Sequence, residues 1–142
     1  MQVHETQIRV RYAETDQMGV VYYANYLVWM EVGRVEYCKA LGFSYKQMEM
    51  EDGVFLAVAE ATCRYSSPAR FDEDVRIRTW VAEANSRMVH FHYEMIADED
   101  RRKVASGVTK HVFLGRDMRP CRMPEKYREK FGLAPVGLSP SR

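Results

Sequence analysis

The sequence lacks an excess of charge of either sign. Its 142 residues carry 21 Lys and Arg against 20 Asp and Glu, a formal net charge of +1. General nucleic-acid binders usually carry a clear basic surplus, so this near balance argues against a nucleic-acid-binding protein. A chain of this length suits one domain with one core.

Cysteine is scarce, and so are clusters of metal ligands. The three cysteines, Cys38, Cys63 and Cys121, are odd in number and far apart, and they match no metal-ligand spacing. His90 and His92 are two positions apart, a weak signal without a third ligand. We therefore expect no metal site and a reduced, cytoplasmic setting.

Targeting signals and membrane spans are missing too. Residues 1–11 are polar and alternating, without the apolar core of a signal peptide. The main apolar stretch, about residues 22–41, is interrupted by charges, so we expect no membrane insertion. There is no internal repeat and no low-complexity run.

That apolar stretch predicts the central element of the fold. Its apolar or small residues follow a helical period: Tyr26, Trp29, Met30, Gly33, Tyr37, Ala40 and Leu41. Valines widen this stripe, which predicts a helix buried on nearly every side. Gly42 follows as a residue able to end it. We expect this helix to lie in the concave face of a sheet.

Alternating polarity predicts the sheet. We expect strands over residues 6–12, 54–65, 74–83, 87–97 and 103–114, a short amphipathic helix over 43–51, and a C-terminal helix over 124–131. Alanines at alternate positions of 54–65 are expected to let the central helix approach closely. The order predicts an α+β fold, with one antiparallel five-stranded sheet wrapped around one long helix. Open edge strands favour pairing with a second copy.

Two stretches carry a resemblance. Residues 12–26 read YAETDQMGVVYYANY and residues 65–70 read YSSPAR, with Glu31 on the helix between them. Together they resemble the hotdog-fold acyl-CoA thioesterases, in particular the 4-hydroxybenzoyl-CoA thioesterase family and the YbgC-like enzymes. The resemblance covers about residues 6–131 of a single domain spanning 1–142, with residues 132–142 expected to be a flexible tail. It implies a dimer whose sheets join, with active sites at the dimer interface.

The resemblance also implies a site. The catalytic carboxylate of the family falls on Asp16, opposite the first turn of the central helix. Tyr23 occupies the helix-start position, where YbgC-like enzymes commonly have histidine and the hydroxybenzoyl branch has tyrosine. This chain therefore combines YbgC-like surroundings with the tyrosine.

The residue types suit thioester hydrolysis. A thioester has a good leaving group, so the reaction needs a nucleophile or base and a means of holding the oxyanion. Asp16 can attack directly or activate water, although an aspartate there is also typical of a turn or helix cap. Unpaired N–H groups near Val21 to Ala24, including Tyr22 and Tyr23, can stabilise the oxyanion. Gly19 would let the substrate approach the backbone.

Substrate contacts are predicted around this stretch. Tyr22, Tyr23 and Tyr26 either line an acyl pocket or pack at the helix start, and Tyr23 is expected to contribute mainly its N–H. The resemblance implies a basic cluster for the coenzyme A phosphates at the turn that precedes Arg87, and Arg70 and the basic residues at 101–103 are further candidates. Exposed arginines are, however, more often simply solvated surface residues. Aromatic residues suit benzoyl or phenylacetyl groups, and short aliphatic chains fit as well.

The predicted function is hydrolysis of an acyl-CoA to a free acid and coenzyme A by a cytoplasmic homo-oligomer, a dimer or tetramer. No metal or redox cofactor is implied. Two alternatives stay open: hydrolysis of acyl groups on acyl-carrier protein, and a non-catalytic acyl-CoA-binding or scaffold module. A hotdog dehydratase would need a catalytic histidine, and residues 12–26 contain none. Glu60 and Cys63 are interpreted as structural residues.

Overall fold

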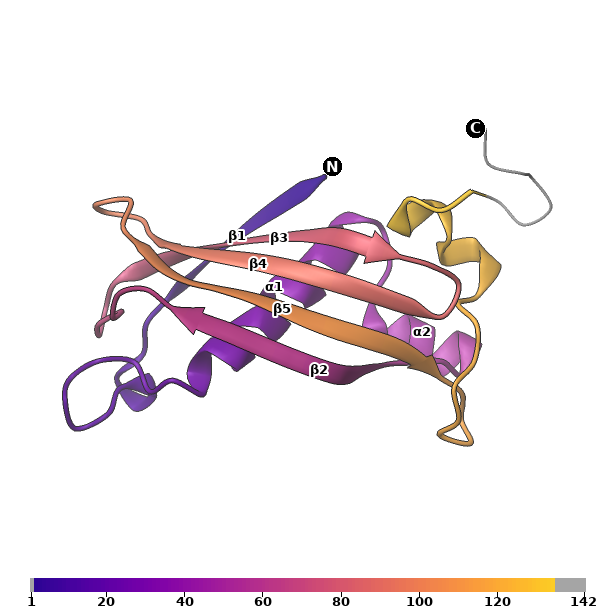
Figure 1. The fold of residues 1–142 in the computed structure, drawn as a ribbon, viewed down its shortest axis with the longest axis horizontal. Helices are drawn as coiled ribbons and strands as arrows, with labels where there is room; N and C mark the ends of the chain where they lie inside the picture. Colours follow the sequence, from indigo (N-terminus) through magenta and orange to yellow (C-terminus); the bar gives the residue numbers. More distant parts are fainter. Residues whose placement is uncertain (1, 135–142) are drawn as a thin grey trace.

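A computed structural model describes residues 2–134. Five antiparallel strands form one sheet in the order β1-β3-β4-β5-β2, and helix α1 crosses one face of it at an angle (Figure 1). The predicted α+β class is confirmed. The elements run β1 (Val3–Arg9), α1 (Asn25–Ala40), α2 (Tyr45–Asp52), β2 (Phe55–Tyr65), β3 (Asp74–Ala84), β4 (Met88–Ala97) and β5 (Lys103–Leu114). Short 3₁₀ turns span Tyr12–Glu14, Glu125–Tyr127 and Glu129–Phe131.

The core lies between α1 and the inner face of the sheet. In β4, residues alternate strictly between half-buried and buried, as a strand with one covered face requires. The largest fully buried side chains come from α1, α2 and the three central strands, and include Trp29, Met30, Met48, Ile77, Phe91, Tyr93, Met95 and Phe113.

Glycines let α1 lie close to the sheet. A Cβ on Gly33 of α1 would lie 2.5 Å from the Thr79 Oγ1 atom of β3, and a Cβ on Gly107 of β5 would lie 2.0 Å from the Met30 Cε atom. The expectation that alanines of the second strand serve this purpose is wrong. Ala59 and Ala61 are exposed at the sheet edge, because β2 is the last strand of the sheet.

A β-bulge explains why alternate residues of β2 do not stay on one face of the sheet along the whole strand, as the sequence predicted. The pairing of β2 with β5 shifts between Val58 and Glu60, which leaves Ala59 as the extra residue. Val58 pairs with the buried His111, whereas Glu60 pairs with the outward Lys110. The alternation therefore changes face at Ala59, and the inner face carries Cys63 and Tyr65 beyond it.

Helix α1 is covered on one side only, contrary to the expectation that it is buried nearly all round. Leu27 and Val28 are 43% and 48% exposed, and Glu31 is exposed as well. Conversely, Arg34 is buried. Its Nε–H donates to the Tyr45 hydroxyl at 2.7 Å and its Nη1–H donates to the Tyr93 hydroxyl at 3.1 Å.

Several predicted boundaries differ from the structure. The first strand ends at Arg9 rather than residue 12, because the 3₁₀ turn begins at Tyr12. The C-terminal helix is replaced by the two last 3₁₀ turns. The predicted tail falls largely on residues 135–142, outside the described residues. Within residues 2–134, no helix has the length and apolar character to cross a membrane.

Candidate active site

The site begins at a tight turn that holds Asp16. The Gly19 N–H donates to the Asp16 carbonyl at 3.0 Å, and Gly19 has a φ of +79°, which favours glycine. The Met18 N–H donates to Asp16 Oδ1 at 2.8 Å. Among residues 2–134, Asp16 Oδ2 has no hydrogen-bond partner. The carboxylate is thus both a turn residue and, through its second oxygen, a group free to meet a substrate or a water.

Glu14 ties this turn to α1. Its side chain is only 5% exposed. Oε1 accepts the Arg11 N–H and Oε2 accepts the Trp29 Nε1–H, both at 2.8 Å. The Glu14 carbonyl accepts the Tyr22 N–H at 2.8 Å and the Asn25 amide at 2.9 Å. Glu14, two positions before Asp16, therefore attaches the turn to both the start and the second turn of α1.

The start of α1 leaves two backbone donors unused. The Val21 N–H donates to the Ala69 carbonyl at 2.9 Å, and the Tyr22 N–H is taken by Glu14. Both were predicted to be unpaired, and the structure corrects this. Within the described residues, the N–H groups of Tyr23 and Ala24 have no partner, and Ala24, the N-cap, makes no side-chain cap. These two donors lie at the positive end of the helix dipole.

A cleft of about 350 Å³ opens in front of this turn. Four predicted site residues line it: Asp16, Val21, Tyr23 and Tyr26. Six further residues line it that the sequence had not assigned to a site: Met18, Val20, Tyr65, Ser66, Ser67 and Pro68.

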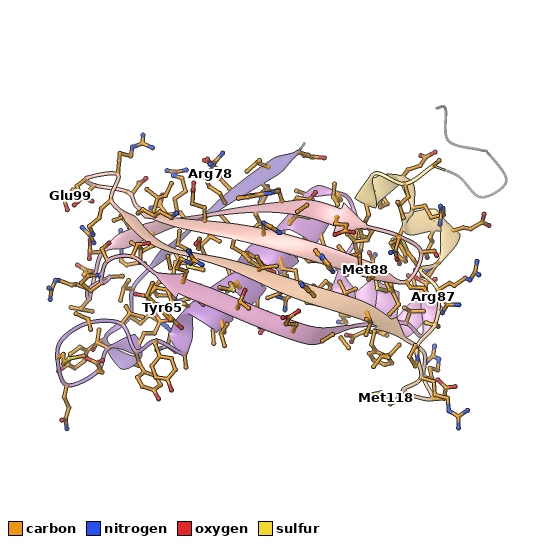
Figure 2. The ribbon with its side chains drawn as sticks, in the orientation of Figure 1. Tyr65, Arg78, Arg87, Met88, Glu99 and Met118 are labelled. Atoms are coloured by element: carbon orange, nitrogen blue, oxygen red, sulfur yellow. The ribbon has the colours of Figure 1, made fainter. Side chains whose placement is uncertain are left out.

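Aromatic rings form much of the wall of this cleft. The Tyr65 ring packs edge-on against Tyr26 with centroids 5.2 Å apart, and against Tyr23 at 6.5 Å. Tyr26 is buried, and this burial raises its pKa. In Figure 2, Tyr65 lies at the end of β2 beside the start of α1. The wall is therefore largely apolar and aromatic, and Asp16, Ser66 and Ser67 add polar side chains to it.

The other predicted residues lie around the cleft or far from it. Gly19 lines a neighbouring hollow, and Tyr22 packs on Tyr23 with ring centroids 4.6 Å apart. Arg70 is exposed, and its backbone forms an isolated antiparallel β-bridge with Val20 beside the turn. Arg87 lies at the opposite end of the sheet from Tyr65 (Figure 2), so one chain does not bring it to Asp16.

Metal ligands do not gather in the part of the chain that the structure describes. Residues 2–134 contain no group of three or more His, Cys, Asp or Glu side chains arranged to hold an ion. His90 lies 3.4 Å from Glu83, and the His92 ring packs against Trp80. Both histidines therefore contact other side chains, on the outer face of the sheet.

Comparison with known proteins identifies the family. Residues 10–131 match the family model described as the thioesterase-like superfamily. The chain belongs to this family. It is 45% identical over 95 residues, 67% of this chain and 68% of the relative, to a putative acyl-CoA thioesterase, YneP, of Bacillus subtilis. It is 28% identical over 124 residues, 87% of this chain and 90% of the relative, to the acyl-CoA thioesterase YbgC of Haemophilus influenzae.

A solved structure gives the same answer for the fold. The DHNA-CoA thioesterase of Staphylococcus aureus superimposes with a TM-score of 0.87 at 32% identity, covering 92% of this chain and 89% of that one. The predicted resemblance to hotdog acyl-CoA thioesterases is confirmed, and the protein is an enzyme that hydrolyses thioesters.

Proposed function

We propose that the protein hydrolyses acyl-CoA thioesters with Asp16 as the catalytic carboxylate and the N–H groups of Tyr23 and Ala24 as the oxyanion hole. One observation carries the proposal. Asp16 and Tyr23 line the same cleft, and among residues 2–134 one Asp16 carboxylate oxygen and the Tyr23 N–H have no hydrogen-bond partner. Acyl transfer requires a nucleophile or base and an oxyanion donor in one site.

The reaction follows from these groups. The thioester carbonyl oxygen accepts hydrogen bonds from Tyr23 and Ala24 and gains negative charge as the tetrahedral intermediate forms. Asp16 either attacks the carbonyl carbon, giving a mixed anhydride that water then cleaves, or takes a proton from an attacking water. In both routes the C–S bond breaks, coenzyme A leaves as a thiolate that is then protonated, and the free acid remains. The proposed reaction uses no metal or redox cofactor.

The cleft wall supports binding of the acyl group and pantetheine arm. Tyr23, Tyr26 and Tyr65 supply aromatic surface for an acyl group of aromatic or short aliphatic type. Arg70, exposed beside the turn, is a proposed partner of the coenzyme A phosphates. Arg87 can serve the same purpose only from a second copy, because it lies at the far end of its own sheet.

A second copy is part of the proposal. Within the part of the chain that the structure describes, strand β2 pairs on one side only and presents an eleven-residue edge. Exposed apolar side chains occur on this strand and on the helix: Val58 on β2, and Leu27 and Val28 on α1. Natural proteins rarely leave a long edge of this kind bare. We propose that two copies pair along β2, which sets the cleft of one copy beside the Arg87 end of the other, in a cytoplasmic dimer or a tetramer built from it. Sedimentation equilibrium tests this, and a stable monomer contradicts it.

The substrate is tested by following thiol release over a panel of short aliphatic, long aliphatic and aromatic acyl-CoA thioesters. The same acyl groups on acyl-carrier protein form the second half of the panel. We expect hydrolysis of the acyl-CoA thioesters, with a kcat/KM higher than for the same acyl groups on acyl-carrier protein. If only the acyl-carrier-protein thioesters are hydrolysed, acyl-carrier protein and not coenzyme A is the carrier of the substrate. Tight acyl-CoA binding without turnover would favour a binding module.

A further inference from the structure

Tyr65, which was not predicted as a site residue, makes a contact with consequences for the oxyanion hole. Its hydroxyl donates a hydrogen bond to the Tyr23 carbonyl oxygen at 3.1 Å. The contact joins the last residue of β2 to the turn that opens α1, 42 positions earlier in the chain. Figure 2 shows Tyr65 beside this turn.

The accepting carbonyl belongs to a particular peptide unit. The carbonyl of Tyr23 and the N–H of Ala24 are two ends of one planar, conjugated amide. That carbonyl also accepts the Tyr26 N–H at 3.4 Å. The Ala24 N–H is one of the two donors without a partner in the described residues. Hydrogen bonds in a chain polarise one another, so donation to the carbonyl strengthens the N–H as a donor.

We propose that Tyr65 is a positioning residue of this enzyme: its hydroxyl orients and polarises the Tyr23–Ala24 peptide, so that the Ala24 N–H stabilises the oxyanion more strongly. The inference rests on the proposed function, because it assigns Ala24 to the oxyanion hole. Tyr65 itself acts through the backbone and needs no contact with the reacting atoms.

The surroundings of Tyr65 suit this task. Its ring is held edge-on by Tyr26, which is buried, and by Tyr23, which restricts the direction of the hydroxyl. Desolvation, with Cys63 close by, raises the pKa of Tyr65 to about 12. The hydroxyl therefore stays protonated, and able to donate, through the pH range of a thioesterase assay.

The size of the effect follows from two general magnitudes. One oxyanion-hole donor contributes roughly 10²- to 10³-fold to kcat. Cooperative strengthening within a hydrogen-bond chain is about 10–30% per bond. The free-energy contribution of the donor is proportional to the logarithm of its rate factor, so losing about 10–30% of that contribution lowers kcat roughly two- to eightfold. This is the effect expected when the Tyr65 hydroxyl is removed.

The test compares Tyr65→Phe with Tyr127→Phe. Each change removes one hydroxyl that donates a hydrogen bond, since the Tyr127 hydroxyl donates to Asp52, away from the cleft. We expect Tyr65→Phe to lower kcat roughly two- to eightfold with KM little changed, and Tyr127→Phe to leave kcat unaltered. Incorporation of 3-fluorotyrosine at position 65, which has a more acidic hydroxyl, should keep kcat at or above the wild-type value.

A spectroscopic measurement separates polarisation from simple structural support. Asp16→Asn would hold an acyl-CoA without turnover, so the thioester carbonyl stretch can be followed by infrared difference spectroscopy. Adding Tyr65→Phe should move this band to higher wavenumber, because the oxygen is less strongly hydrogen-bonded. An unshifted band, or a kcat loss shared with Tyr127→Phe, overturns the inference. If Asp16→Asn retains full turnover, the proposed function fails instead, and the two failures are distinct.

Discussion

The bonds made by Glu14 predict a large and specific effect of its removal. Its carboxylate is almost fully buried and accepts two hydrogen bonds, one from the Trp29 indole and one from the Arg11 backbone. Glu14→Ala deletes both acceptors and leaves the Trp29 Nε1–H without a partner in the core. Glu14→Gln retains one amide oxygen, which can accept only one of the two donors well.

The magnitude follows from these contacts. A hydrogen bond to a charged group contributes about 1.5–3 kcal/mol, and a buried donor left unsatisfied costs about 1–3 kcal/mol. Because the bond from the Arg11 N–H is only part-buried, we expect it to contribute little, and Glu14→Ala to lower the free energy of unfolding by about 3 kcal/mol in total. For a chain of this size that corresponds to roughly 6–12 °C in Tm. Glu14→Gln should lose about half as much.

Urea unfolding at one fixed protein concentration measures these changes, since association would otherwise shift the midpoint. A double-mutant cycle with Trp29→Phe isolates the buried bond, and contacting residues couple by about 0.5–3 kcal/mol. Turnover should fall in Glu14→Ala as well, because the Asp16 turn loses its anchor on α1. A loss below about 0.5 kcal/mol for Glu14→Ala, or strictly additive effects with Trp29→Phe, would show that the Glu14–Trp29 bond does not stabilise the fold.

Two further predictions concern the core. Gly33→Ala should lower the free energy of unfolding by about 1–3 kcal/mol, because its Cβ would meet Thr79 at 2.5 Å; a stabilised variant in urea unfolding would show that α1 can shift. Burial and the nearby Arg34 lower the pKa of His111 to about 3. As the pH falls below about 6.5, His111 therefore binds a proton in the unfolded chain but stays neutral in the folded chain. Stability should therefore fall by about 2 kcal/mol between pH 7 and pH 5, and an unchanged pH slope in His111→Gln would contradict this origin.

The catalytic turn could be predicted from sequence because its determinants are local. Asp16 and Gly19 shape one four-residue turn, and the residues around them carry the family motif. The strands of the central sheet were predictable for a similar reason: Val75, Ile77 and their neighbours alternate along β3 because one face is buried.

What failed depends on contacts between distant segments. The N–H groups of Val21 and Tyr22 looked free, yet their acceptors lie on Ala69 and Glu14. Likewise, the Tyr65 hydroxyl finds its acceptor 42 residues away. The segment 65–70 was noticed for its motif, but only the folded loop places it across the cleft.

Other errors came from position within the fold. Alanine spacing in β2 favoured a helix-facing strand, but the bulge at Ala59 and the edge position of β2 exposed that surface. A buried Arg34 could not be expected from a helical period, because its partners Tyr45 and Tyr93 come from other elements.

Asp16 is proposed to perform the chemistry, and the variant Asp16→Asn separates this role from its role in the turn. Asparagine keeps a side-chain oxygen for the Met18 N–H and so preserves the turn, while it removes the nucleophile or base. Steady-state thiol release from the preferred acyl-CoA should fall by about 10²- to 10⁴-fold, with Tm and substrate binding close to wild type. Turnover within tenfold of wild type in a folded, substrate-binding Asp16→Asn protein would contradict the account.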